Sequence, residues 1–230
     1  MKNKTLTAGD LDARIHYCMT YIGGFMGTYT VFSFAGSFGN AGTANMISIF
    51  TNFFKGNIFT MMLKILGLLI YSLGITLAVW LPKHTIISTK MLSLKLTCAC
   101  GILIWLLPDT LPPTVGLYPT FFAMSFQWCC FHGAYGYGSS TIFCTNNIRQ
   151  FVTGIVETYL NGNEEKLKIK FFGFTLLAFN LGVVTMCLLF TRFNFGVKSS
   201  VLVLVPAIFG SYYIKEKEKM HKKWINMHQT

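Results

Sequence analysis

Long apolar runs alternate with short polar segments along the chain, and this pattern predicts membrane-spanning helices. A helix crosses a hydrocarbon core of about 30 Å with about 20 mainly apolar residues. Several of the runs reach this length. The pattern predicts an all-α integral membrane protein with six transmembrane helices, at about residues 16–35, 58–81, 91–107, 120–134, 171–190 and 201–214.

Two further apolar stretches are too short to cross a bilayer. They cover about residues 43–54 and 145–159. A helix of a dozen residues rises only about 18 Å, which is well short of the hydrocarbon core. We therefore expect two short re-entrant or broken helices in addition to the six spans.

The two short stretches begin with similar polar motifs. Residues 40–46 read Asn-Ala-Gly-Thr-Ala-Asn-Met, and residues 141–148 read Thr-Ile-Phe-Cys-Thr-Asn-Asn-Ile. In both copies a Thr stands two residues before an Asn. Membrane interiors tolerate polar, breakable backbone only where protein or a water-filled cavity covers it. The repeated motif is therefore the best candidate for a functional site.

The charges of the loops favour re-entrant elements over crossing ones. If both short stretches crossed, the loop with Lys83 and Lys90 would lie opposite the basic N-terminus. If both dip in and return, the basic segments all fall on one side: the N-terminus, this loop, the loop 161–170 and the lysine-rich tail. The lysine-free loop 108–119 then falls on the other side. The second arrangement follows the positive-inside rule, with Arg192 and Lys198 as exceptions. We expect both termini in the cytoplasm.

The same arrangement predicts an internal repeat. The chain forms a single polytopic domain, residues 1–230, with pseudo-repeats at about 15–108 and 117–214 and a basic cytoplasmic tail at 215–230. Each half reads span, re-entrant element, span, span. Three crossings in each half invert the second half relative to the first. Inverted 3+3 repeats with broken helices near the midplane are an architecture of secondary transporters.

Composition supports the membrane assignment. Of the 230 residues 53% are hydrophobic and 12% charged, with a mean hydropathy of +0.51, which is far from soluble globular usage. In a soluble protein the net charge of +11 would suggest nucleic-acid binding. Here the basic residues cluster in loops and the tail, so the partner we expect is the lipid bilayer, with anionic lipid at the basic segments, and no nucleic acid.

The polar motifs can bind a small polar solute. Thr and Asn side chains and freed backbone groups offer neutral donors and acceptors, which suit such a solute or a weakly held monovalent cation. Helix N-termini near Thr43 and Thr145 favour an anionic group. An alternative is structural: the Thr residues cap the short helices, and the Asn residues bind each other across the bundle. The candidate substrate-binding residues are Asn40, Thr43, Asn45, Gln127, Thr145, Asn146, Asn147 and Arg149.

Other chemistries lack their residues. The predicted spans hold no Asp or Glu, so a carboxylate proton relay has no obvious members. The chain has no phosphate-binding Gly-x-x-x-x-Gly-Lys loop, and no spacing suggests a Ser/His/Asp group or a metal site. The seven cysteines lie in or beside apolar segments, as packing residues do. We expect no enzyme activity, no cofactor and no metal.

The motifs resemble those of the YoaK family of bacterial membrane proteins. The matching segments are residues 21–25 (Tyr-Ile-Gly-Gly-Phe), 38–45 (Phe-Gly-Asn-Ala-Gly-Thr-Ala-Asn), 122–127 (Phe-Ala-Met-Ser-Phe-Gln) and 141–149. The chain departs from the family at Gly27, where members commonly carry an acid, and at His132, where a base is usual. The resemblance implies a multi-pass protein of the bacterial inner membrane, with no established substrate and with some members described as candidate transporters.

Two functional hypotheses follow. The first is a secondary transporter or permease for a small polar solute, in which both Thr-x-Asn elements line a central site. The second is a non-transporting membrane protein, such as a sensor or a partner subunit, in which the motifs lock the bundle. Both are compatible with assembly into a homo-oligomer.

Overall fold

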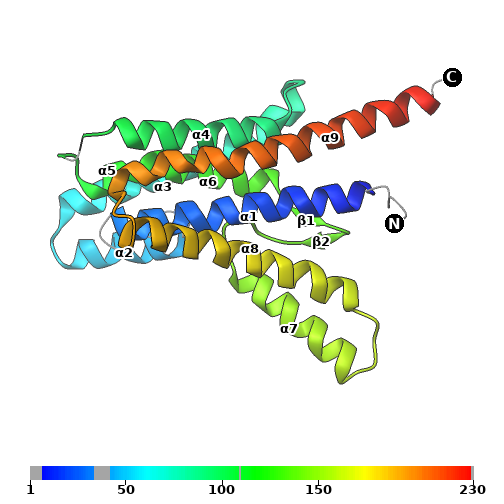
Figure 1. Cartoon of the computed structure of the whole chain (residues 1–230). Coiled ribbons are helices and arrows are strands. Elements are labelled where there is room, and N and C mark those ends of the chain that lie inside the picture. Colours follow the sequence, from blue (N-terminus) through cyan, green and yellow to red (C-terminus); the bar gives the residue numbers. More distant parts are fainter. Residues whose placement is uncertain (1–6, 34–41, 109, 229–230) are drawn as a thin grey trace.

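The computed structural model describes residues 7–33, 42–108 and 110–228, which form a mainly helical bundle (Figure 1). The helices and strands are α1 (Ala8–Ser33), α2 (Gly42–Phe54), α3 (Ile58–His84), α4 (Thr89–Leu106), α5 (Pro113–Gly116), α6 (Tyr118–Cys130), β1 (Gly133–Ala134), β2 (Tyr137–Gly138), α7 (Thr145–Tyr159), α8 (Lys166–Thr191), the 3-10 helix η1 (Gly196–Val203) and α9 (Leu204–His228).

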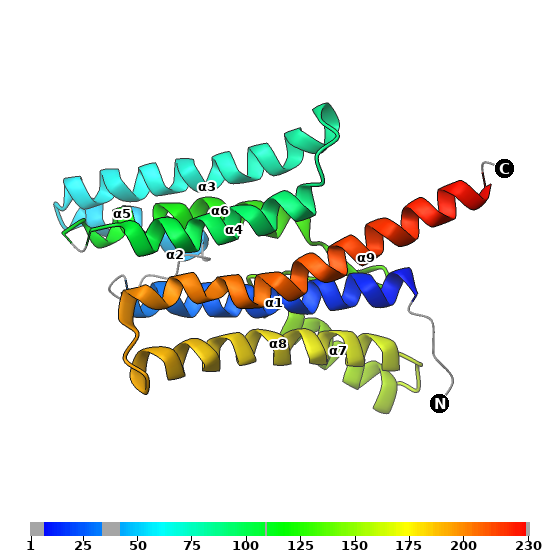
Figure 2. The same ribbon diagram turned by 45° about the horizontal axis from the view of Figure 1, so that its top comes forward.

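The elements run back and forth between two ends of the bundle. The N-terminus, the α3–α4 connection, the α7–α8 loop and the C-terminus lie at one end, which we call the basic end (Figures 1 and 2). The α2–α3 turn, α5 and η1 lie at the opposite end. Most of the loop and tail lysines, including Lys83, Lys90 and Lys168, belong to segments at the basic end, whereas Lys55, Arg192 and Lys198 belong to the opposite end.

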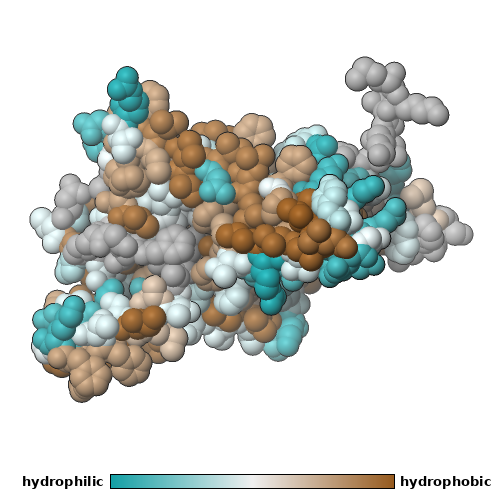
Figure 3. Space-filling model, turned by 90° about the horizontal axis from the view of Figure 1, so that it is seen from below, coloured by the Kyte–Doolittle hydropathy of each residue, from teal (hydrophilic) through white to brown (hydrophobic). Residues whose placement is uncertain are grey.

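Within the described residues, three helices are long and apolar enough to cross a membrane: α3, α4 and α8. Their outward faces are apolar; Leu69 and Leu73 on α3 and Val184 on α8 are each more than half exposed. Apolar side chains cover much of the middle of the face in Figure 3. An apolar surface of this extent requires a nonpolar solvent, because transfer of apolar groups from water to hydrocarbon is favourable.

The helices pack into two clusters, and each cluster draws on both halves of the chain. α6 packs against α3 and α4, and α2 lies on α3; these four helices are the α6 cluster. α1 packs against α8 and α9, and α7 lies on α8; these four are the α1 cluster. The two clusters meet chiefly along α4, η1 and α9. The first helix of each half therefore packs with the later helices of the other half.

Glycines bring the helix backbones together within each cluster. A Cβ atom at Gly182 of α8 would collide with the Tyr21 carbonyl oxygen and the Phe25 amide of α1. A Cβ atom at Gly74 of α3 would collide with the Phe122 carbonyl oxygen and the Ser125 hydroxyl of α6. Helices in lipid associate by such close packing, since lipid tails are as apolar as leucine.

The structure agrees with the predicted elements at the short stretches and differs from them elsewhere. The two short stretches form the separate helices α2 and α7. The fourth predicted span is shorter than expected: α6 ends at Cys130, and a two-stranded hairpin follows, so the chain is not purely α-helical. The backbone becomes extended at Phe131, and the hairpin then turns through positive φ angles at Gly133, Tyr135 and Gly136, which glycine adopts without a steric cost.

The basic tail continues the last helix, which the sequence pattern did not specify. α9 runs as one helix from Leu204 to His228. Lysine and glutamate are good helix formers, and Ser88 and Asp12 contact this extension. All seven cysteines are unpaired.

Candidate functional site

A non-helical segment between β2 and α7 crosses the interior of the protein. Ser139 and Ser140 are 8% exposed, and Thr141 and Ile142 are fully buried. α1 approaches this segment so closely that a Cβ atom at Gly23 would collide with the Thr141 carbonyl oxygen. Buried backbone that is not helical has to find hydrogen-bond partners outside a regular element.

Asn147, at the start of α7, supplies these partners. Its Nδ2 donates to the Ser140 carbonyl at 2.8 Å and to the Phe143 carbonyl at 3.1 Å. Its Oδ1 accepts from the Ser139 hydroxyl at 2.9 Å and from the Ser140 amide at 3.4 Å. The side chain is fully buried. Asn147 thus holds its own segment in place, whereas the structural interpretation of the motif expects the two Asn residues to bind each other across the bundle.

Gln127 on α6 bonds to the same segment and to α1. Its Nε2 donates to the Met19 carbonyl at 3.0 Å and to the Thr141 hydroxyl at 3.1 Å. Its Oε1 is buried and has no hydrogen-bond partner among the described residues. Gln127 therefore links the α6 cluster to the α1 cluster and presents one unused acceptor, which a polar ligand or a water molecule can satisfy.

His16 on α1 is a buried polar residue that sequence reasoning missed. Its Nε2 lies 2.8 Å from the Ser139 hydroxyl, and its Nδ1 is buried without a hydrogen-bond partner among the described residues. The Phe171 ring of α8 lies 5.4 Å away. His16 stands at the boundary of the first predicted span, where it reads as a flanking residue. The rule that an ionisable residue inside a span marks a functional site would have singled it out.

The other candidate residues of the second motif lie at or near the surface. Arg149 donates to the Asn146 Oδ1 at 2.9 Å, and both Thr145 and Arg149 are exposed. Thr145 is the first residue of α7, and the N-cap position belongs to Cys144, which makes no side-chain cap bond. The alternative in which Thr145 caps this helix is therefore wrong.

The first motif lies elsewhere. Thr43 is exposed on α2, and Asn45 borders a hollow of about 10 Å³ beside Gly67, Tyr71 and Phe121, which has room for at most one water molecule. Asn40 lies outside the described residues. α2 packs on α3 in one cluster, and α7 packs on α8 in the other. The fold thus joins Gln127 and Asn147 through the segment 139–141, while Asn45 borders a separate hollow.

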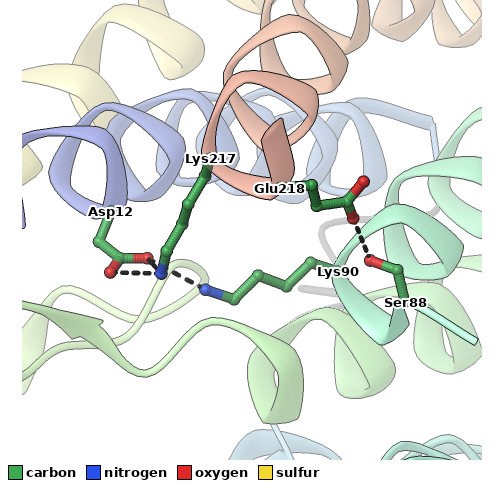
Figure 4. A network of polar contacts seen from close by, with 5 residues as sticks. All are labelled: Asp12, Ser88, Lys90, Lys217 and Glu218. Carbon is green, nitrogen blue, oxygen red and sulfur yellow. Dashed lines mark hydrogen bonds and ion pairs between the residues drawn. The ribbon is translucent and has the colours of Figure 1, made fainter. Parts of the chain in front are cut away.

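A network of charged and polar side chains joins the two clusters at the basic end (Figure 4). The Asp12 carboxylate of α1 accepts from Lys217 of α9 at 2.5 and 2.6 Å and from Lys90 of α4 at 3.2 Å. Ser88 donates to Glu218 at 2.8 Å. The Asp12–Lys90 and Ser88–Glu218 contacts connect the α6 cluster to the α1 cluster. These side chains are partly exposed, so solvent weakens each pair.

Two further contacts fix the N-terminal part of α1. The Tyr135 hydroxyl donates to the Asp10 carboxylate at 2.7 Å. Partial burial and then this bond raise the pKa of Tyr135 to about 12. Arg14 lies over the Tyr213 ring of α9, 5.6 Å from its centroid, within the range of a cation–π contact.

A cavity of about 570 Å³ opens beside this network. Its lining is mainly apolar and includes Ile15 and Ile214, with Lys90 and Lys217 at its border. Among the described residues no group of three or more His, Cys, Asp or Glu side chains lies close enough to hold a metal ion.

Three membrane-length helices and a buried polar segment place the chain among helical membrane proteins. The chain belongs to a family described as "Protein of unknown function (DUF1275)", whose model matches residues 15–212. The match covers most of both clusters. No curated protein matches the chain, and no solved structure does.

Proposed function

We propose that this protein is a secondary transporter or permease for a small polar solute, built from two inverted repeats of three spans and one broken helix. The observation that carries the proposal is a symmetry in the packing. Exchanging the two halves turns α1, α2, α3 and α4 into α6, α7, α8 and α9. The three main contacts of the α1 cluster, α1–α8, α1–α9 and α7–α8, then become α6–α3, α6–α4 and α2–α3, which are the main contacts of the α6 cluster.

The correspondence extends to single atoms. Gly182 of α8 faces the Tyr21 carbonyl and the Phe25 amide of α1, and Gly74 of α3 faces the Phe122 carbonyl and the Phe126 amide of α6. Phe122 and Phe126 each lie 101 residues after Tyr21 and Phe25. The Thr-x-Asn motifs repeat with nearly the same spacing, from Thr43 and Asn45 to Thr145 and Asn147. Repeat interfaces are where transporters of this architecture bind solute.

The directions of the broken helices support inversion. α2 runs outward to the opposite end, whereas α7 runs outward to the basic end (Figure 1). Under the positive-inside rule the basic end, with both termini, faces the cytoplasm. The resemblance to the YoaK family favours the inner membrane of a bacterium, and the basic segments favour anionic lipid as a partner.

The solute site that we propose lies between the clusters, at Gln127 and the segment 139–144. The Gln127 Oε1 provides an acceptor, and the Ser139 and Thr141 hydroxyls provide reorientable groups. In this conformation Asn147 is saturated by the segment itself. A solute therefore gains access when the clusters separate and the segment shifts, which is the rocking motion expected of repeat transporters.

The test begins with thermal unfolding of the purified chain in bilayer nanodiscs over a panel of amino acids, polyols, small organic acids and monovalent cations. Compounds that raise the unfolding temperature are then assayed for uptake into proteoliposomes. Gln127→Leu removes the acceptor, and loss of one buried hydrogen bond to solute predicts about a tenfold weaker affinity. Asn180→Ala, an exposed amide on α8, is the matched control. The proposal fails if no compound binds and no solute is transported.

The alternative is a non-transporting membrane protein, such as a sensor or a partner subunit. The saturated hydrogen bonds of Asn147 and the separate location of Asn45 favour it. It predicts that Asn147→Ala lowers the unfolding temperature while no solute in the panel has an effect.

A further inference from the structure

The hydrogen bonds around Asn147 determine where His16 carries its proton. Both Nδ2 hydrogens of Asn147 go to backbone carbonyls, those of Ser140 and Phe143. The amide cannot be reversed, because its oxygen would then face these two acceptors. The Asn147 oxygen therefore points at Ser139 and accepts the only hydroxyl hydrogen that Ser139 has.

The tautomer of His16 follows from this chain of bonds. Since the Ser139 hydroxyl donates to Asn147, its oxygen accepts from the His16 Nε2, 2.8 Å away. Neutral imidazole carries one N–H, so the Nδ1 of His16 is a bare lone pair. This atom is buried and has no hydrogen-bond partner among the described residues. Burying an acceptor without a hydrogen-bond partner costs free energy. Protonation of Nδ1 turns this acceptor into a donor, and a carboxylate beside the ring can then accept the hydrogen bond and balance the positive charge.

The carboxylate nearest in the chain is Asp12, one helical turn before His16 and on the same side of α1. Asp12 and Lys90 are the charged groups that interact electrostatically with His16. Lys217 of α9 pairs with Asp12, and α8 contributes the uncharged Phe171. In the present conformation Lys90 and Lys217 both pair with Asp12, so a third positive charge, at His16, has no free carboxylate beside it.

We propose that His16 is a proton-binding residue that takes up a proton at Nδ1 when the Asp12–Lys90 ion pair between the two clusters opens. The proton comes from water at the basic end and adds to the Nδ1 lone pair, and the imidazolium replaces Lys90 at the Asp12 carboxylate. Proton binding and separation of the clusters at the basic end are then thermodynamically linked. A role of this proton as the coupling ion rests on the proposed transport function. The linkage between proton binding and separation of the clusters does not.

The tautomer is measured by nitrogen NMR of the full chain with isotope-labelled histidine in phosphatidylglycerol–phosphatidylcholine bilayers. The His16 signals are those lost in His16→Gln. At about pH 7 we expect Nε2 to carry the hydrogen and Nδ1 to be bare. A hydrogen on Nδ1 in the neutral ring would overturn the proposal.

The linkage is measured by titrating the same signals in Lys90→Gln, with Lys95→Gln as the matched control, an exposed lysine on the same helix. Opening the ion pair is expected to raise the proton affinity of His16 about tenfold, which moves its protonation about one pH unit upward relative to the control. Equal titration in Lys90→Gln, Lys95→Gln and the unaltered chain would sink the linkage. The result is independent of whether any solute is transported.

A second measurement follows the movement itself. Spin labels at Ile86 and Lys222, in a chain whose native cysteines are replaced, report the distance between the α3–α4 connection and α9. Acidification from about pH 8 to about pH 5 spans the range in which histidine titrates, and we expect a longer distance to become populated. The same labels in His16→Gln are expected to give one distance at both pH values. A pH response that persists in His16→Gln would contradict the proposal.

Discussion

At the scale of single residues, the polar interior follows from the cost of burying unpaired polar groups. The segment 139–144 leaves the helical hydrogen-bond pattern inside the protein, and Asn147 replaces the missing partners with four bonds. Gln127 and His16 each keep one buried nitrogen or oxygen unused. Residues of this kind are where a bundle can respond to a ligand or a proton.

Asn147→Ala is expected to destabilise the protein, because Ser139, Ser140 and Phe143 lose their partners at once. Each buried group left unsatisfied costs about 1–3 kcal/mol, so the unfolding temperature in detergent should fall by several degrees. Asn146→Ala is the control, since Asn146 is only half-buried and its contact with the Gly138 carbonyl is long, 3.5 Å. Equal unfolding temperatures for the two variants would contradict this role of Asn147.

At the scale of elements, helix contacts depend on glycines that bring backbones together. Gly182 joins α8 to α1, and Gly74 joins α3 to α6. Both glycines belong to ordinary apolar stretches of sequence. Their effect on stability comes from the backbone atoms of the neighbouring helix that lie against them. The matching environments of the two glycines are also the sharpest support for the proposed repeat.

Gly182→Ala and Gly74→Ala are each expected to destabilise the bundle, because the added methyl group meets backbone atoms that cannot turn aside. Overpacking of this kind costs about 1–3 kcal/mol. Gly138→Ala is the control, as open space surrounds its Cβ position. Thermal unfolding of the three variants in nanodiscs checks the expectation, and the repeat further predicts similar losses for Gly182→Ala and Gly74→Ala. An unchanged unfolding temperature for Gly182→Ala would show that α1 and α8 can move apart to accommodate the methyl group, and would contradict the expectation.

At the scale of the whole molecule, the two ends differ in charge and the two clusters meet through few polar contacts. The Asp12–Lys90 and Ser88–Glu218 contacts lie at the basic end. At the other end, the Ser200 hydroxyl bonds to the Gly101 carbonyl of α4 at 2.9 Å. The rocking mechanism that we propose would require the contacts at the two ends to form and break in turn.

The proposed topology predicts that the α2–α3 turn and the α7–α8 loop face opposite sides of the membrane. In a chain with its native cysteines replaced, Asn57→Cys should react with an impermeant thiol reagent added outside intact cells. Asn163→Cys should react only after the cells are opened. Lys222→Cys on α9 is the control for the cytoplasmic side. Labelling of Asn57 and Asn163 from the same side would refute the inversion.

The sequence by itself determined the class of protein and the short helices. Apolar runs of membrane length specify helices in lipid whatever surrounds them, and the residues of α2 and α7 are too few to cross. The repeated Thr-x-Asn motif is likewise visible in the sequence alone. The hairpin after α6 and the continuation of α9 through the basic tail were missed, because glycine backbone angles and charged helix formers are compatible with several local structures.

Only the tertiary structure decided which polar residues act together. It joined Gln127 to Asn147 through a buried segment, separated Asn45 from both, and added His16, whose sequence position reads as the edge of a span. It also paired the first helix of each half with the later helices of the other half. These are contacts between residues far apart in the chain, and their energies depend on burial and on the neighbouring groups, which no local pattern of apolar and polar residues encodes.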